Sequence, residues 1–288
     1  MNKMSLENKY DFKVIFSVKN ANPNGDPLNG NRPRQDFEGY GEVSDVAIKR
    51  KIRNRLQDMG ESIFIQSTDR SDDGYTNLKD RTESVEELKQ ILKDKKKADV
   101  DAFARIAAAQ WFDVRAFGQV FAFSGSQVSV GVRGPVSVQL AESIEPVEIN
   151  SMQITKSVNS VPGDGKGSDT MGTKHFVTNG LYVFNGSINP QLAAKTGFSD
   201  EDAEKILEAL QSLFENDASA ARPEGSMAVE KVFWWKHPSK LGKYPSAKVH
   251  RSVQLTKKEE IDVPHSIDDY NIVVDELEGL AVQELEGI

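Results

Sequence analysis

Five basic side chains near the N-terminus have the spacing of a phosphate-binding surface. Two lie in a glycine- and proline-rich stretch at 22–41, NPNGDPLNGNRPRQDFEGYG, and three in the helix expected after it: Arg32, Arg34, Lys49, Arg50 and Arg53. A guanidinium group can donate two parallel hydrogen bonds to a phosphate, and glycines let backbone N–H groups approach an anion. These residues therefore indicate a track for a phosphodiester backbone.

Two aspartates in the same stretch could support a different chemistry. Asp26 and Asp36 could act as an acid, a base or metal ligands of a ribonuclease on a mobile loop. Lone carboxylates in turns more often bind their own backbone, so we expect them only to shape the loop. A calcium loop starting at Asn22 does not fit, because its sixth and twelfth positions would be Pro27 and Pro33.

Other enzyme signatures are absent from the sequence. It has no G-x-S-x-G or H-E-x-x-H motif, and its GDGKGS segment fails as a P-loop because Gly follows the lysine. It has no cysteine, which excludes disulfides and thiolate chemistry, and its four scattered histidines offer little for a metal. We expect no catalytic residue, no metal and no cofactor.

A second basic region at 231–251 contains six Lys or Arg residues and no acid. Its interleaved aromatic side chains are Phe233, Trp234, Trp235 and Tyr244. Such a pattern is found where bases of single-stranded nucleic acid stack on a protein. It also fits a buried strand, and we favour that reading.

The net charge of −8 is a property of one segment. Residues 259–288 hold ten acidic and no basic residues, and without them the balance is slightly positive. Partners must therefore be inferred from local clusters, not from the total charge. No run approaches the length of a membrane helix and none resembles a signal peptide, so we expect a soluble cytoplasmic protein.

The elements that would hold the basic cluster follow from periodicity. Residues 10–19 alternate as a half-buried strand, and Ser44 can cap a helix that ends near Gly60. We expect the stretch between them to be structureless until RNA binds. The open face of the strand would carry Lys13, Ile15, Ser17 and Lys19, without the aromatics that read bases, so binding through the RNA backbone is expected.

The rest of the chain completes a recognisable order. Helices are expected within 61–110, and strands from 113 to 118 and from 128 to 140, the latter interrupted by a bend or bulge at 133–135. A strand at 175–188, a helix opened by Ser199 and a strand at 228–235 follow. This order predicts an α+β, ferredoxin-like β-α-β-β-α-β domain. Insertions at 60–127 and 150–176 would project from it, and the glycine-rich part of the second cannot be core.

Motifs spread from residue 22 to about 242 resemble a known family. They are Asn22-Pro-Asn-Gly-Asp-Pro, Asn31-Arg-Pro-Arg, Gly39-Tyr-Gly, Ser44-Asp-Val, Lys49-Arg-Lys-Ile-Arg, Asp113-Val-Arg-Ala-Phe-Gly, Ile154-Thr-Lys-Ser-Val-Asn, Met171-Gly-Thr-Lys-His-Phe and Lys236-His-Pro-Ser-Lys-Leu-Gly. Together, and in this order, they resemble the CRISPR-associated backbone protein (seventh Cas family, RAMP superfamily) of type I Cascade, closest to subtype I-C.

The resemblance implies a single RRM-like palm with helical fingers at 60–127, a β-hairpin or loop thumb at 150–176 and an acidic tail at 259–288. It implies a non-catalytic subunit that polymerises along the CRISPR RNA spacer and presents it to target DNA. Its partners would be copies of itself, the guide-processing and large subunits, and a recruited helicase-nuclease.

The resemblance also assigns site residues. The guide RNA would contact Asn24, Arg32, Arg34, Lys49, Arg50, Arg53, Arg115, Arg133, Lys156, Met171, Lys174 and His175. Met171 would pack at a displaced nucleotide, since an unbranched thioether adapts to irregular surfaces. Arg115 and Arg133 lie in strand-like context and could instead be structural.

Two other functions remain open at this point. Related type III backbone proteins cut target RNA with a loop aspartate, and Asp26 and Asp36 lie in the matching region. A self-assembling structural protein without nucleic acid is the other possibility.

Overall fold

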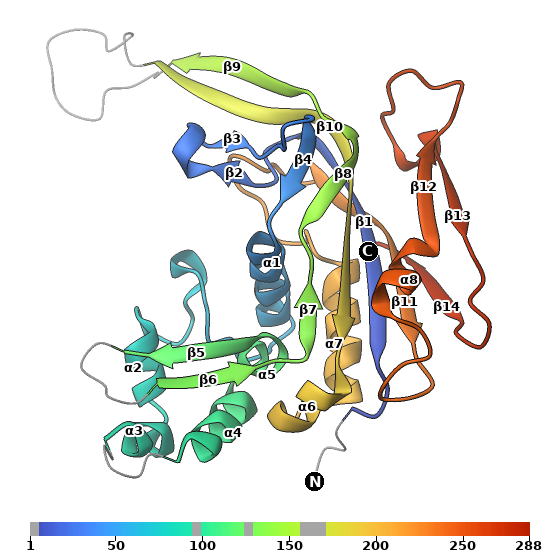
Figure 1. Cartoon of the computed structure of the whole chain (residues 1–288). Coiled ribbons are helices and arrows are strands. Elements are labelled where there is room, and N and C mark those ends of the chain that lie inside the picture. Colours follow the sequence, from blue (N-terminus) through green and yellow to red (C-terminus); the bar gives the residue numbers. More distant parts are fainter. Residues whose placement is uncertain (1–5, 94–98, 124–128, 156–170) are drawn as a thin grey trace, which may run out of the picture.

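An antiparallel sheet forms the centre of the computed structural model, which describes residues 6–93, 99–123, 129–155 and 171–288. Neighbouring strands follow the order β14-β11-β1-β10-β8-β4, and β7 and β9 also pair with β10 (Figure 1). Their bounds are Tyr10–Ala21 (β1), Tyr40–Val43 (β4), Val136–Val138 (β7), Ala141–Pro146 (β8), Ile149–Thr155 (β9), Met171–Ile188 (β10), Met227–Lys236 (β11) and Val282–Glu286 (β14). The chain is thus a mixed α/β protein.

Helices α1 and α7 cover one face of this sheet and pack on each other. The helices of the described residues are Asp45–Asp58 (α1), Leu78–Glu83 (α2), Glu86–Lys93 (α3), Val100–Gln110 (α4), Phe112–Phe117 (α5), Pro190–Thr196 (α6), Asp200–Gln211 (α7) and Ser246–Arg251 (α8). The Ser44 side chain caps α1, and Ser199 forms a capping box with Asp202 on α7, which confirms both predicted starts. No helix in the described ranges combines the length and apolar character needed to cross a bilayer.

Strand β1 is buried on both faces. Phe12, Val14 and Phe16 pack under the helices, as their alternation predicts. The opposite face was expected to be open, but Ile15 is fully buried there and Lys13 is only 8% exposed. The prediction of a half-buried strand is wrong because a second layer covers this face.

That second layer is built from the C-terminal part of the chain, namely α8, β12 (Val253–Lys257) and β13 (Tyr270–Val274). The acidic segment continues as β14, which extends the sheet beside β11. There Lys231 Nζ lies 2.8 Å from Glu284 and 2.6 Å from Glu286. The segment is therefore part of the folded domain.

A buried carboxylate ties this layer to β1. The Lys243 N–H donates to His237 Nδ1 at 2.9 Å, so His237 Nε2 carries the proton that it donates to Asp11 at 2.8 Å. Burial alone would raise the pKa of Asp11, but hydrogen bonds from His237, His250 and Lys9 outweigh it and hold that pKa below its usual range. The Lys236-His-Pro-Ser-Lys-Leu-Gly motif thus has a structural role through His237.

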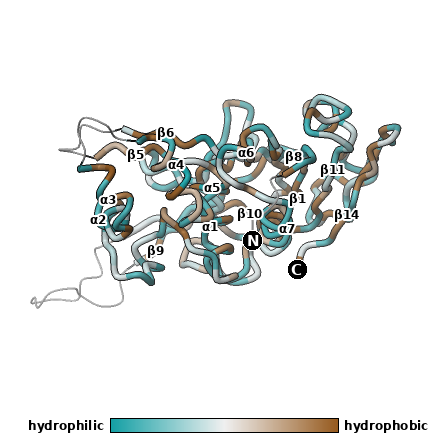
Figure 2. The backbone as a smooth tube through the Cα atoms, turned by 90° about the horizontal axis from the view of Figure 1, so that it is seen from below, coloured by the Kyte–Doolittle hydropathy of each residue, from teal (hydrophilic) through white to brown (hydrophobic). Residues whose placement is uncertain are grey.

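The predicted insertion is a lobe with its own core. It contains α2 to α5 and the hairpin of β5 (Gly118–Ala122) and β6 (Ser129–Arg133). Buried aromatic side chains fill it, among them Phe64, Phe103, Trp111 and Phe121. Figures 1 and 2 place this lobe on one side of the central sheet and the C-terminal strands on the other.

Two strand predictions in this region need correction. Residues 113–118, expected to be a strand, belong mostly to helix α5, because Asp113 and Arg115 are held by ion pairs to neighbouring helices and Gly118, with φ of 80°, ends the turn. The strand expected at 128–140 with a bend or bulge at 133–135 is two strands in different sheets, which separate at the predicted interruption. Gly134 lies between them, where a Cβ would overlap the carbonyl oxygen of Ala116.

Candidate nucleic-acid interface

The glycine- and proline-rich stretch is folded, contrary to the expectation of a structureless loop. Strands β2 (Gly25–Asp26) and β3 (Arg32–Pro33) pair across the 3-10 turn Pro27–Asn29. Gly30 and Asn31 both have φ of 58°, a conformation that Gly and Asn adopt more readily than other residues and that reverses the chain here. We call residues 25–33 the 25–33 hairpin.

Both loop aspartates bind their own backbone. Asp26 accepts a hydrogen bond from Leu28 N at 3.2 Å and lies 3.5 Å from Arg34 Nη2. Asp36 accepts from Glu38 N at 2.9 Å and Tyr40 N at 2.8 Å. The two carboxylates therefore form turns, as their sequence context predicts.

The 25–33 hairpin contacts a projecting pair of strands. We call β9 and residues 171–177 of β10 the ribbon; it extends beyond the edge of the sheet (Figure 1). Arg32 Nη1 donates to Ser151 Oγ at 3.0 Å, and Ser151 Oγ lies 2.8 Å from His175 Nδ1. Arg32 and His175, two predicted RNA ligands from distant parts of the chain, are thus joined through Ser151.

The ribbon presents apolar side chains away from the hairpin. Met152 and Ile154 are 52% and 49% exposed and alternate with Ser151, so they point to the opposite face. Lys174 pairs directly opposite Met152 and shares this face. Met171 is also exposed, on the Ser151 face, where Gln153 Nε2 lies 2.7 Å from its sulfur. Lys156 lies outside the described residues.

The cations of α1 differ in their availability. Lys49 Nζ lies 2.8 Å from Asp45 in an exposed pair one helical turn apart. Arg50 Nη1 donates to the Ile65 carbonyl at 2.6 Å and has no carboxylate within salt-bridge distance among the described residues. Burial and the nearby Arg53 lower the pKa of Arg50 from its ordinary value. Arg50 is therefore a half-buried cation that an anion would stabilise.

Two other predicted ligands hold the fold together. Arg53 Nε donates to Asp113 at 2.8 Å, and Asp113 also accepts from the backbone of Phe64 and Ile65. Arg115 makes two 3.0 Å bonds to Asp202. The Arg115 pair is bidentate, and both arginines are largely buried beside a buried carboxylate, so the geometry favours structural roles for both.

The remaining predicted RNA ligands in the described residues are Asn24, Arg34 and Arg133. Asn24 Oδ1 accepts from Ser44 N at 2.9 Å and so shapes the start of α1. Arg34 lies beside Asp26, with a buried Nε that has no partner. Arg133 is exposed on β6, which packs with β5, α4 and α6, and the structure does not bring it to the 25–33 hairpin.

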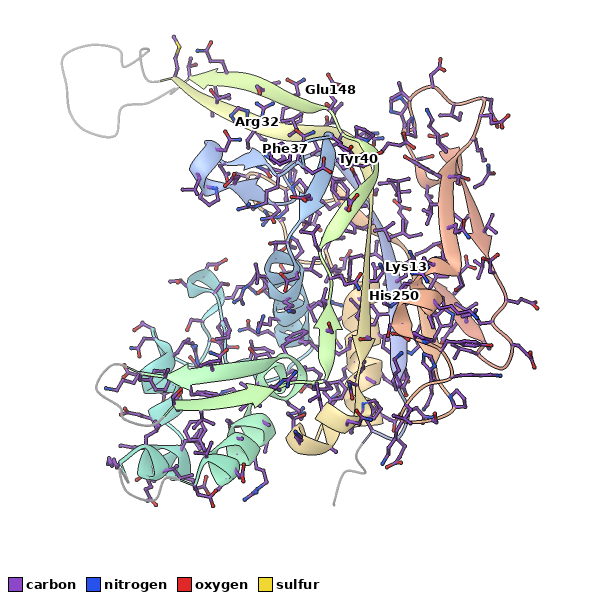
Figure 3. The ribbon with its side chains drawn as sticks, in the orientation of Figure 1. Lys13, Arg32, Phe37, Tyr40, Glu148 and His250 are labelled. Carbon is purple, nitrogen blue, oxygen red and sulfur yellow. The ribbon has the colours of Figure 1, made fainter. Side chains whose placement is uncertain are left out.

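One exposed side chain was missed from the sequence. Phe37 is fully exposed between Asp36 and Tyr40, in the turn that Asp36 stabilises (Figure 3). An exposed aromatic ring on such a turn is a platform on which a base can stack. By contrast, Phe233, Trp234 and Trp235 are buried, as the core interpretation of 231–251 predicts.

These features define a mixed α/β protein with the 25–33 hairpin, a cationic helix and a projecting ribbon. The family model described as CRISPR-associated protein Cas7 matches residues 8–275, and the chain belongs to this family.

The chain is also similar to a curated relative and to chains of solved structures. The CRISPR-associated protein Cas7 of Haloferax volcanii is 27% identical over 223 residues, which are 70% of this chain; the chain spans 63% of that relative's length. Two solved structures are also similar. A chain of "CRISPR RNA-guided surveillance complex, pre-nicking" has 19% identity and a TM-score of 0.48, covering 79% of this chain and 75% of that chain. A chain of "CRISPR RNA-guided surveillance complex" has 16% identity and a TM-score of 0.44. The match covers 79% of this chain and 68% of that chain.

Proposed function

We propose that this chain is a non-catalytic backbone subunit of a type I, I-C-like Cascade surveillance complex, which binds CRISPR RNA through its phosphates. The observation that carries the proposal is that the 25–33 hairpin contacts the ribbon through Arg32 and Ser151, while the start of the hairpin lines a common hollow with Arg50 of α1. Arg32 and Lys49 are partly exposed, and Phe37 offers a stacking surface nearby in the chain. Cations with an aromatic platform suit single-stranded RNA.

The architecture supports an RRM-like palm with two projections. Strands β11, β1, β10 and β8 are neighbours in that order and are connected through α1 and α7, as in split β-α-β units. The lobe, whose hairpin continues to Arg133, would be the fingers predicted at 60–127, and the ribbon would be the thumb predicted at 150–176. Residues 259–288 would complete the domain.

The subunit would work in the cytoplasm as one of several copies along the guide spacer. It would present the guide to target DNA alongside the guide-processing and large subunits, and a helicase-nuclease would be recruited to cut. Family membership and the exposed apolar face of the ribbon support this arrangement.

The competing ribonuclease function is tested directly. The complex assembled on a guide is incubated with complementary RNA and a divalent metal ion. We expect intact target RNA, because Asp26 and Asp36 are engaged with their own backbone. Regularly spaced cleavage that is lost in Asp26→Ala or Asp36→Ala would replace the proposal.

RNA binding is tested with the double variant Arg32→Ala/Lys49→Ala. Each lost phosphate contact on a single strand lowers the slope of log K against log salt by about 0.7, so the variant should lose about 1.4. Fluorescence anisotropy with a short RNA at several salt concentrations measures this slope. Lys195→Ala/Lys240→Ala, which removes the same charge from surfaces outside the interface, is the control. An equal decrease in both double variants would contradict the proposed interface.

A further inference from the structure

A hollow of about 150 Å³ lies where the C-terminal layer meets the central sheet. Its walls are residues 145–148 at the end of β8, residues 178–181 of β10, the loop 263–265 and Tyr270 at the start of β13. The Asn179 side chain donates to the Pro264 carbonyl at 2.7 Å and so holds this loop against β10. We call it the C-terminal hollow. Its volume is room for a group about the size of a benzene ring.

The C-terminal hollow carries negative charge without a basic side chain to balance it. Glu145 and Glu148 line it, and neither forms an ion pair with a described residue. Glu148 immediately precedes β9 (Figure 3). Among the described residues that line the hollow there is no Lys or Arg, and the one imidazole is that of His265. The hollow therefore favours a cation.

A buried tyrosine is a second, independent sign of a ligand. Tyr270 is only 7% exposed, yet its hydroxyl has no hydrogen-bond partner among the described residues. Thr178 Oγ1 also lacks a partner but is wholly buried, whereas the Tyr270 hydroxyl is not sealed from solvent. Burial and the charges of Glu145 and Asp269 raise the pKa of Tyr270 to about 12. A cationic group in the hollow would give this hydroxyl the partner that buried polar groups normally have.

An arginine side chain fits the C-terminal hollow better than a metal ion or a lysine. The described residues hold no group of three or more His, Cys, Asp or Glu side chains suited to a metal ion. A guanidinium is planar, offers five N–H donors, stacks on aromatic rings and is more weakly hydrated than an ammonium. Two carboxylates and the Tyr270 hydroxyl can accept its N–H groups, and Pro146 and Leu181 offer apolar surface to its methylene groups.

The surrounding charge indicates which kind of molecule would present that arginine. The segment 259–288, which forms part of the wall, has ten acidic residues and no Lys or Arg. A basic protein is attracted to such a surface, whereas a second copy of this chain has a net charge of −8 and is not.

We propose that the C-terminal hollow is the docking site for one arginine side chain of a basic partner protein. The guanidinium donates to Glu145, Glu148 and the Tyr270 hydroxyl. None of the residues that line the hollow belongs to the 25–33 hairpin, to α1 or to the ribbon. The inference thus goes beyond the proposed function and does not depend on RNA binding.

The test uses the purified full chain and a short end-blocked peptide, Gly-Ser-Arg-Ser-Gly, with matched peptides that carry citrulline or lysine instead of arginine. NMR shifts of the backbone amides of residues 178–181 report binding. The arginine peptide should cause saturable shifts, neutral citrulline none, and lysine should bind at least about threefold more weakly. Glu145→Gln should weaken binding of the arginine peptide about tenfold or more, and Tyr270→Phe about fivefold, the effects of a charged and a neutral hydrogen bond.

The matched control is Glu142→Gln. Glu142 is an exposed carboxylate on β8, the same strand as Glu145, but lies outside the hollow, so its removal should leave binding unchanged. Thermal unfolding checks each fold, and Tyr270→Phe, which removes one oxygen, decides the test if Glu145→Gln unfolds.

Three results would overturn the proposal. They are an arginine peptide that causes no saturable shift, equal binding of the lysine or citrulline peptide, and an equal loss in Glu142→Gln. Sedimentation of the chain alone adds a fourth: weaker self-association of Glu145→Gln would assign the hollow to another copy of this chain instead of a basic partner.

Discussion

The role of an arginine in this protein depends on the acid that the fold places beside it. Arg53 and Arg50 share one helix and were both predicted to bind phosphate. Asp113 lies 2.8 Å from Arg53 and is only 1% exposed, whereas Arg50 contacts a carbonyl. Sequence spacing can show that two cations share a helix face, but a partner 60 residues away is set by tertiary packing.

We therefore expect Arg53→Ala to act on stability. The substitution leaves the Asp113 carboxylate buried without its cation, and breaking such a pair costs about 3 kcal/mol or more. Urea unfolding at pH 7 should show this loss. Lys49→Ala removes an exposed pair and should change the free energy of unfolding by no more than about 0.5 kcal/mol. A fully stable Arg53→Ala protein with weakened RNA binding would restore Arg53 as an RNA ligand.

At the scale of elements, long helices with a capping residue could be predicted from the sequence, whereas short helices and strands could not. Helices α1 and α7 run for 14 and 12 residues with Ser caps, so their periodicity and their starts were readable. Helix α5 has 6 residues, too few to distinguish a helical from an alternating pattern, and distant ion pairs stabilise it. The 25–33 hairpin was missed because each of its strands has 2 residues.

The C-terminal layer was also unpredictable from β1 alone. Lys13 and Ser17 on the second face of that strand favour solvent, and nothing local indicates that α8 and β13 cover it. Ile15, which lies on the same face as Lys13 and Ser17, is apolar and is buried under this layer. Covering the face therefore leaves a lysine inside the protein.

The buried Lys13 makes stability depend on pH. Burial lowers the pKa of Lys13 to about 8, below its ordinary value of about 10.4. The charged form thus opposes folding: the cost is fully present below pH 8 and disappears as pH rises toward 10.4. Lys13→Met should stabilise the protein at pH 7 by about 2 kcal/mol, and this advantage should shrink toward pH 10.

Urea unfolding at pH 7 and pH 10 measures that difference. Lys19→Met, an exposed lysine on the same strand, should show no pH-dependent gain. If Lys13→Met were destabilising at both pH values, the ammonium would have a stabilising partner, and the layer would have to pack differently around it.

On the scale of the whole molecule, the acidic residues of 259–288 and the cations of the candidate interface lie on different parts of the protein. The acids of 259–288 lie in the C-terminal layer and β14, while the cations of the candidate interface lie with the 25–33 hairpin, α1 and the ribbon. The total charge of −8 therefore does not oppose RNA binding at that end.

Under the proposed function, the apolar face of the ribbon is the surface through which copies would associate along one RNA. Met152 and Ile154 expose apolar surface on the face turned from the hairpin, where nothing within the described chain covers them. Two such side chains on a projecting ribbon are stabilised if a neighbouring copy buries them. Met152→Ser/Ile154→Ser should therefore reduce the number of copies per guide RNA while the first copy binds with unchanged affinity.

Mass photometry of complexes on a guide-length RNA counts those copies, and anisotropy with a short RNA measures the first binding step. Val263→Ser/Val273→Ser, which polarises two comparably exposed valines on the C-terminal side, is the matched control and should leave the copy number unchanged. An unaltered copy number in the ribbon variant would show that the copies associate through another surface. A loss of the first binding step would instead assign Met152 and Ile154 to RNA contact, because a single copy has no neighbour for the ribbon to touch.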